Sequence, residues 1–184
     1  DIRRLILLYS KIEDGLFAIV KPSRRDARFS VTCGKRYLAG VLGLVGKEMR
    51  WKLRQNIYGR GGYDRDTRKQ KYNGARYYAL NLHSWFYRGT IEFRHSQGTV
   101  RQKTIQNWAI LCGAVVDYAY RHTEREIKDL QGTSLEILYG IAPTAEVRAY
   151  IRDRVLHWDP DRAAELPLLR GQQELFAAPP EGEV

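Results

Sequence analysis

The chain has 184 residues, of which 43% are hydrophobic and 11% aromatic, a composition that excludes a disordered protein and suffices for one domain with a core. No apolar run approaches the ~20 residues that cross a bilayer, and two cysteines are too few for a disulfide framework or a cysteine-based zinc site. The net charge of +10 favours anionic partners such as nucleotides, nucleic acids or acidic polymers, and with no visible signal peptide we expect a cytoplasmic protein without membrane contact.

Two amphipathic helices are predicted in the first third of the chain. Apolar residues recur at spacings of three and four over residues 2–19, and Pro22 ends this helix before a basic turn, Ser23–Asp26. A second apolar stripe over residues 38–53 predicts another helix. Glycines weaken that prediction, because each costs up to about 1 kcal/mol relative to alanine in a helix interior.

Basic residues concentrate between Arg50 and Arg76, where only two aspartates oppose them. Gly61-Gly62 and Asn73-Gly74 within this stretch indicate that much of it is a mobile loop. Its cations are Arg50, Lys52, Arg54, Arg60, Arg65, Arg68, Lys69, Lys71 and Arg76. One possible function is therefore a nucleic-acid-binding module, in which interleaved aromatic residues stack on bases. Those residues are Trp51, Tyr58, Tyr63 and Tyr72.

The most informative stretch follows directly. Residues 76–83 and 90–94 predict two β-strands joined by a short turn. Because side chains alternate across a strand, Glu92 and Arg94 project together from one face, while the apolar residues beside them face a core.

These polar groups suit a site for a metal ion and a phosphate. Mg²⁺ prefers carboxylate oxygens, as Glu92 offers, and Arg94 can hold a transferring phosphoryl group by charge-assisted hydrogen bonds. Arg76 opens the neighbouring strand and adds a second cation. Asn81 and His83 share a face of that strand, and we expect His83 to act through hydrogen bonds and not as a metal ligand. The alternative is a solvated ion pair worth about 0–1 kcal/mol.

The second half of the chain opens on a predicted helix. Thr99 and Gln102 match a capping box ahead of an apolar stripe over residues 105–119. We expect this helix to pack on the sheet face that carries Ile91 and Phe93.

Two further helices and a tail complete the chain. Thr133 and Glu136 match a second capping box, with Gly140 as the stop, and Pro143 and Thr144 open the last helix. Residues 158–184, with a Pro-Pro pair and several acids, predict a partly disordered tail. Helices around one strand pair, without regular strand–helix alternation, indicate an α+β fold with an antiparallel sheet.

Several of these motifs resemble those of the putative amidoligase family. The resemblance rests on the run from Arg76 to His83, the Gly89–Arg94 run with its Glu-Phe-Arg, the Gly98-Thr99 before a tryptophan-containing helix, and the Ser-Arg-Arg that begins at Ser23. It covers about residues 1–157. The family belongs to the carboxylate–amine ligase superfamily, which includes glutamine synthetase and glutamate–cysteine ligase.

The resemblance implies a partial glutamine synthetase-like catalytic domain over residues 1–157. It also implies an ATP-dependent ligase that uses Mg²⁺, in which ATP phosphorylates a carboxylate and an amine attacks the acyl phosphate to form an amide or peptide-like bond. The implied site residues are Glu92 as the metal ligand, Arg94 and Arg76 in catalysis, and Asn81, His83, Arg24 and Arg25 for nucleotide or substrate.

Members of the family also carry an earlier Glu-x-Glu strand and a His-Val-His strand, which this sequence lacks. We therefore expect a C-terminal part of the ligase, incomplete on its own. The expected partners are small-molecule or peptide carboxylate and amine substrates, together with an acidic polymer or protein at the basic stretch. Besides the nucleic-acid-binding module, a catalytically inactive scaffold for a partner protein stays open.

Overall fold

A computed structural model describes residues 2–59 and 69–166 of the chain. The α-helices are α1 (Ile2–Ala18), α2 (Gly34–Leu38), α3 (Gly46–Tyr58), α4 (His83–Arg88), α5 (Gln102–Arg121), α6 (Glu124–Asp129), α7 (Ser134–Ile141) and α8 (Ala145–Trp158). The strands are β1 (Leu80–Asn81) and β2 (Glu92–Phe93), and the 3₁₀ helices are η1 (Pro22–Arg24), η3 (Gly74–Tyr77) and η4 (Pro160–Glu165). The mostly helical chain with its small antiparallel sheet confirms the α+β prediction.

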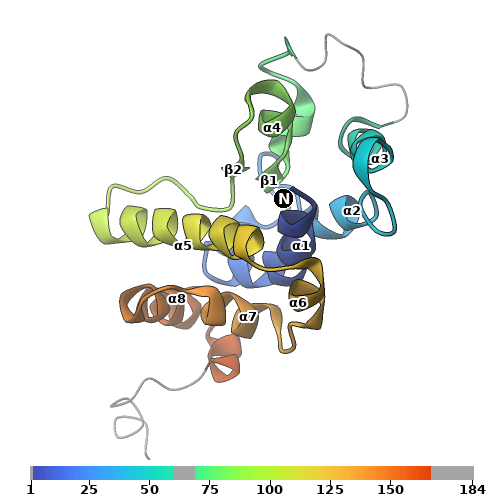
Figure 1. The fold of residues 1–184 in the computed structure, drawn as a ribbon. Coiled ribbons are helices and arrows are strands. Elements are labelled where there is room, and N and C mark those ends of the chain that lie inside the picture. The colour runs from blue at the N-terminus through green and yellow to red at the C-terminus, as the bar shows by residue number, and fades with distance from the viewer. Residues whose placement is uncertain (1, 60–68, 167–184) are drawn as a thin grey trace, which may run out of the picture.

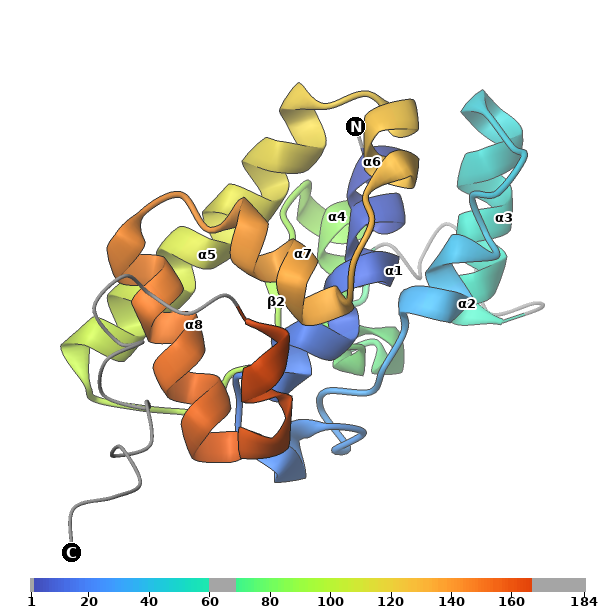
Figure 2. The ribbon, with the colours of Figure 1, turned by 90° about the horizontal axis from the view of Figure 1, so that it is seen from below.

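Helix α1 is the centre of the core. It packs against α2, α5, α6, α7 and α8, and its apolar residues are almost all buried, including Ile6, Leu8 and Ile12, whose exposure is 0%. Figure 2 shows α1 running between α2 on one side and α7 on the other. The predicted first helix is therefore confirmed, and Pro22 begins η1 where the sequence predicted a basic turn.

Helices α6, α7 and α8 begin as their sequences dictate. Thr133 and Glu136 form the predicted capping box: the Thr133 hydroxyl accepts from the Glu136 N–H, and the Glu136 carboxylate accepts from the Thr133 N–H. Thr144 caps α8. Helix α7 continues through Gly140 to Ile141, so the predicted stop is wrong by one residue. Trp158 ends α8 and η4 follows, while residues 167–184 of the predicted tail lie outside the described residues.

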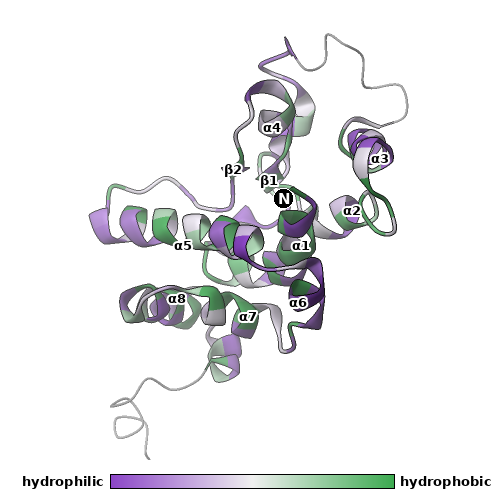
Figure 3. Cartoon of the chain, viewed as in Figure 1, coloured by the Kyte–Doolittle hydropathy of each residue, from purple (hydrophilic) through white to green (hydrophobic). Residues whose placement is uncertain are grey.

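Helix α5 is present where predicted but begins differently. Arg101 precedes it without a side-chain cap, and the Thr99 hydroxyl accepts from the Arg101 N–H before the helix starts, so the predicted Thr99 capping box is wrong. The buried face of α5 meets α1 and α8. Ile91 and Phe93 line one pocket of ≈ 520 Å³ together with Cys112 and Val116 of α5, so α5 faces these sheet residues as predicted but does not cover them completely. Figure 3 shows polar and apolar residues alternating along α5 and α8.

Residues 38–53 do not form one helix. The chain breaks between α2 and α3, where Gly43 and Gly46 have φ angles of 70° and 56°. Residues with a Cβ rarely adopt this left-handed conformation, so the glycines that weakened the prediction mark its failure. The first part of the basic stretch, up to Tyr58, belongs to α3, and residues 60–68 lie outside the described residues.

The sheet is much smaller than the sequence suggested. Leu80 lies opposite Phe93 and Asn81 opposite Glu92 in an antiparallel pair. The residues expected as a strand end and a turn form α4 instead, which ends at Gly89 with a φ of 77°. Val31 adds a parallel bridge: its N–H donates to the Tyr77 carbonyl at 3.0 Å. Figure 1 shows this small sheet and α4 together above α1 and α5.

Within residues 2–59 and 69–166, the structure holds no helix both long and apolar enough to cross a membrane.

Candidate functional site

The structure brings four of the seven predicted site residues into one pocket. Arg76, Asn81, His83 and Glu92 line it, from η3, β1, α4 and β2. Lys71, Ser84, Tyr87 and Arg88 complete the lining. The pocket volume is ≈ 40 Å³, room for about one water molecule, so a larger ligand has to lie across its mouth.

Glu92 sits between two donors. One carboxylate oxygen lies 2.7 Å from the guanidinium of Arg94, and the other accepts from the Asn81 amide at 2.6 Å. The side chains of Arg94 and Glu92 are 17% and 37% exposed. The pair is therefore partly buried, unlike the solvated surface pair of the alternative interpretation. Glu92 lines the pocket, whereas Arg94 is not among the described residues that line it.

Asn81 fixes the direction of the Glu92 carboxylate. Its amide nitrogen donates to Glu92 and to the Ser84 hydroxyl at 3.0 Å, and its side-chain oxygen accepts from the Ser84 N–H at 3.2 Å. Asn81 and Ser84 are both buried. A carboxylate without a proton can only accept hydrogen bonds, so the NH₂ group of Asn81 must face Glu92. This hydrogen bond fixes the Glu92 carboxylate, an acceptor, at the pocket.

Arg94 is anchored on its other side. Its Nε donates to the Phe29 carbonyl at 2.9 Å, and its guanidinium lies 5.8 Å from the centre of the Tyr77 ring. A planar guanidinium with one edge tied down keeps its remaining N–H groups in a fixed orientation. One of them, on Nη1, donates to Glu92.

His83 does not share a strand face with Asn81 as predicted, because it begins α4. Its Nε2 donates to the Gln70 carbonyl at 2.8 Å, so Nδ1 accepts from the Tyr58 hydroxyl at 2.6 Å. Burial lowers the pKa of His83, and the charge of Arg76 lowers it further, although the Gln70 carbonyl raises it. The neutral ring joins α3, Gln70 and α4 at the base of the pocket.

Arg76 lies at the rim of the pocket. Its guanidinium donates to the Lys71 carbonyl at 3.3 Å and lies 5.5 Å and 5.9 Å from the centres of the Tyr72 and Tyr77 rings. Asn73 supports this segment by capping η3, where its side chain accepts from the Ala75 N–H.

Arg24 and Arg25 are not among the described residues that line this pocket. Arg24 donates to the backbone carbonyls of Arg94 and His95, at 2.7 Å and 3.1 Å, and so supports the end of β2. Arg25 turns away and pairs with Asp14 at 2.5 Å. Their predicted role in binding nucleotide or substrate stays a prediction.

The pocket does not form a metal site by itself. Glu92 is the only carboxylate among the described residues that line it, and both its oxygens already accept hydrogen bonds. No group of three or more His, Cys, Asp or Glu residues that could hold a metal occurs anywhere in the described ranges. One carboxylate beside several cations suits a Mg²⁺ ion that arrives with phosphate oxygens in its shell.

The residue after Arg94 has a structural role. His95 is fully buried, and its Nε2 lies 3.0 Å from the Tyr9 hydroxyl, which donates to Glu13 at 2.9 Å. Tyr9 therefore accepts from the Nε2–H, and Nδ1 has no partner among the described residues. Burial, with smaller contributions from Arg24 and Arg25, lowers the pKa of His95 to about 3.

This burial predicts a stability loss in mild acid. Between pH 6.5 and 3 the imidazole is protonated in the unfolded chain but not in the folded chain. The free energy of unfolding therefore decreases as the pH is lowered, by up to about 1.4 kcal/mol per pH unit. From pH 6.5 to 5 we expect the wild type to lose about 1.5 kcal/mol more than His95→Phe in urea unfolding. Parallel pH profiles would contradict the burial of a neutral His95.

The aromatic residues proposed for base stacking differ in their exposure to solvent. Trp51 and Tyr72 are 57% and 74% exposed, whereas Tyr58 points inward to His83. Tyr63 lies outside the described residues. Two exposed aromatic residues near cations are less than the continuous platform that single strands use.

Sequence reasoning missed several pocket residues. The sequence predicts a strand end and a turn over residues 83–88, which gives no reason to place Tyr87 and Arg88 in a site. Helical spacing is the signal that could have found Tyr87, because it lies four residues after His83 and therefore on the same helix face. Ser84 carries no sequence signal of its own, and the structure shows it as a hydrogen-bond partner of Asn81.

Comparison with protein families identifies a relationship over most of the chain. A family model described as putative amidoligase enzyme matches residues 1–116. The matched range runs from α1 into α5 and includes the whole Glu92 pocket. Searches of curated proteins and of solved structures find no match.

Proposed function

Because the chain belongs to the putative amidoligase enzyme family, whose members are ligase-type enzymes, we propose that it takes part in ATP-dependent joining of a carboxylate to an amine. The observation that carries the proposal is the 2.7 Å ion pair between Arg94 and Glu92, the carboxylate that lines a pocket together with several cations. The glutamine synthetase-like architecture, the C-terminal position of this part and the cytoplasmic location belong to the same proposal.

The pair is proposed to exchange partners when nucleotide binds. Glu92 would turn one oxygen from Arg94 to the magnesium ion, and Arg94 would turn its freed N–H groups to a phosphate oxygen. Asn81 stays on the other oxygen of Glu92 and keeps it in place. Bound Mg²⁺ would supply charge compensation on the phosphates. The ion pair thus occupies, in the free protein, both positions that the metal nucleotide needs.

The rest of the pocket favours a polyanion. Three cations, Lys71, Arg76 and Arg88, face one carboxylate among the described lining residues. Their charges would stabilise the phosphates across the mouth of the pocket. His83 acts as a positioning residue, because it holds the Gln70 carbonyl and with it the adjoining Lys71 backbone.

The proposed reaction has two steps. A carboxylate oxygen of the substrate attacks the γ-phosphorus of ATP, and the bond to ADP breaks, which leaves an acyl phosphate. The amine nitrogen then attacks the acyl carbon, phosphate leaves with the C–O bond electrons, and the nitrogen gives its proton to the departing phosphate. Arg94 touches the phosphoryl group in both steps and stabilises the charge on its oxygens.

Metal and nucleotide binding should be strictly coupled. Because Glu92 alone cannot hold Mg²⁺, we expect isothermal titration to detect no Mg²⁺ binding without nucleotide, and ATP binding only when Mg²⁺ is present. EDTA should abolish the ATP signal. Tight binding of Mg²⁺ alone, or equal binding of ATP with EDTA, would contradict the proposed site.

The other partners are further proposals. An acidic polymer or peptide substrate fits the positive charge near Lys71 and Arg76. A nucleic-acid-binding module is supported by the exposure of Trp51 and Tyr72, and predicts binding that is indifferent to Glu92. A scaffold would form a stable complex without nucleotide turnover.

A further inference from the structure

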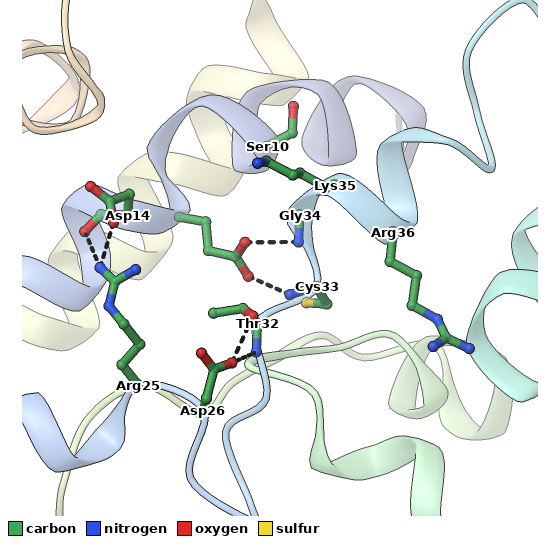
Figure 4. Close-up of a pocket in the computed structure, with 10 residues that line it drawn as sticks. Ser10, Asp14, Arg25, Asp26, Thr32, Cys33, Gly34, Lys35 and Arg36 are labelled. Carbon is green, nitrogen blue, oxygen red and sulfur yellow. Dashed lines mark hydrogen bonds and ion pairs between the residues drawn. The ribbon is translucent and has the colours of Figure 1, made fainter.

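A second cavity lies between α1, residues 25–34 and α2 (Figure 4), away from the Glu92 pocket. Its volume is ≈ 530 Å³, within the range of ligand sites. Charges of both signs line it in equal number: Glu13, Asp14 and Asp26, with Arg25, Lys35 and Arg36. The Glu92 pocket suits an anion, whereas this balance suits a ligand that carries both charges.

Most of these charges are already satisfied within the protein. Glu13 accepts from the N–H groups of Cys33 and Gly34, at 2.7 Å and 2.8 Å, and from the Tyr9 hydroxyl. Asp14 pairs with Arg25 and also with Arg162 at 2.7 Å. These groups form a rigid polar wall.

Arg36 is engaged as well. Its Nε donates to the Asn56 carbonyl, and its guanidinium lies 5.2 Å from the centre of the Tyr78 ring. It therefore contributes positive charge at the edge of the cavity while it ties α2 to α3.

Asp26 and Lys35 remain available to a ligand. One oxygen of Asp26 accepts from the Thr32 N–H and hydroxyl, at 3.1 Å and 2.7 Å, and the other has no partner among the described residues. The hydrogen bonds from Thr32 lower the pKa of Asp26, so it is ionised at neutral pH. The ammonium of Lys35 makes no hydrogen bond or ion pair with any residue in the described ranges.

Asp26 also has an unusual backbone. Its φ of 53° is left-handed, and no other residue except glycine has a positive φ in the described part of the chain. Aspartate and asparagine tolerate this conformation better than other residues with a Cβ. The turn it makes directs the Asp26 carboxylate toward Thr32 at the cavity wall (Figure 4).

We propose that this cavity binds a zwitterion, namely a free amino acid, with its ammonium group on Asp26 and its carboxylate on Lys35. The proposal rests on the proposed ligase function in one respect, since such an enzyme must bind an amine as well as the nucleotide. The amino acid has two possible sources: it is the amine that is joined, or it is an effector that is not consumed.

The test uses matched variants of the full chain and the twenty free L-amino acids as probes. Asp26→Asn keeps the left-handed backbone and an acceptor for Thr32 but removes the charge, and Lys35→Met keeps the length. Lys47→Met is the control, because Lys47 follows Gly46 at the start of α3 as Lys35 follows Gly34 at the start of α2. Isothermal titration measures each affinity.

We expect at least one amino acid to bind saturably, and each cavity variant to weaken that binding about tenfold or more. Lys47→Met should bind as the wild type does, and neither ethylamine nor acetate should compete at equal concentration. The proposal is overturned when no amino acid binds at millimolar concentration, or when binding persists in both cavity variants.

Two further readouts separate the outcomes. Consumption of one amino acid per ADP released identifies the joined amine, whereas recovery of the amino acid unchanged identifies an effector. Glu92→Gln, titrated in parallel, should keep amino-acid binding while it loses metal-dependent nucleotide binding. A protein that binds metal nucleotide but no amino acid refutes this cavity alone, and the reverse result refutes the Glu92 site alone.

Discussion

Replacing Arg94 with alanine is expected to weaken Mg²⁺–ATP binding roughly 10- to 150-fold, because a hydrogen bond to a charged group contributes about 1.5–3 kcal/mol. Turnover should fall further, by roughly 10²–10³-fold, since the lost donor stabilises the transferring phosphoryl group. Arg94→Lys keeps the charge but not the planar fork, and should recover only part of the affinity. Titration calorimetry and an ADP-release assay measure the two effects.

Glu92→Gln separates the metal from the phosphate. The amide keeps the shape of the side chain and an acceptor for Asn81, but it is a poor magnesium ligand. ATP affinity in this variant should therefore be low and the same with and without Mg²⁺. Arg125→Ala is a matched control for the loss of one cation, because its side chain is 92% exposed on α6. If both Glu92→Gln and Arg94→Ala bind Mg²⁺–ATP with wild-type affinity, the two residues form only a surface ion pair and not a nucleotide site.

Gly15→Ala is expected to destabilise the fold by about 2 kcal/mol. A Cβ at this position would lie 2.6 Å from the Ser134 carbonyl oxygen and 2.9 Å from its carbon, where α1 crosses the start of α7. Both are backbone atoms and cannot move aside as a side chain would. Overpacking of this kind costs about 1–3 kcal/mol or more, which outweighs the gain in helix propensity of up to about 1 kcal/mol.

Gly140 provides the control for this prediction. It lies inside α7, and a Cβ there meets nothing within 4 Å. Gly140→Ala should stabilise the protein by up to about 1 kcal/mol. Urea unfolding of both variants measures the free energies. If Gly15→Ala is as stable as Gly140→Ala, then α1 and α7 do not approach each other so closely, and the prediction is wrong.

The helices were predictable where one face of the chain is buried. α1 carries its apolar residues at helical spacing along its whole length, and Thr133 and Thr144 mark helix starts by local hydrogen bonds. β1 and β2 are two residues long each, too short to leave an alternating pattern. Their expected lengths came from the apolar neighbours, which belong instead to α4 and to the segments beside it.

The site was partly predictable for a similar reason. Arg76, Asn81, His83 and Glu92 lie within seventeen residues of sequence, so one strand pair is enough to bring them together. Strand alternation puts His95 on the same face as Ile91 and Phe93, although its residue type gives no reason to expect burial. Its Nε2 bonds to the Tyr9 hydroxyl, 86 positions away in the sequence.

The second cavity could not have been predicted. Its walls come from the polar face of α1 and from residues 25–36, which the sequence describes only as a solvated helix face and a basic turn. Pairing across such distances depends on how α1 and α2 pack, and no local pattern encodes it. Asp26 and Lys35 look like ordinary surface charges until that packing is known.

A crystal structure of the full chain with Mg²⁺ and a non-hydrolysable ATP analogue tests the central claim most directly. The proposal predicts a phosphate oxygen on the Arg94 guanidinium, the metal on Glu92, and loss of the 2.7 Å contact between these two side chains. A nucleotide bound elsewhere, with that contact intact, would contradict it.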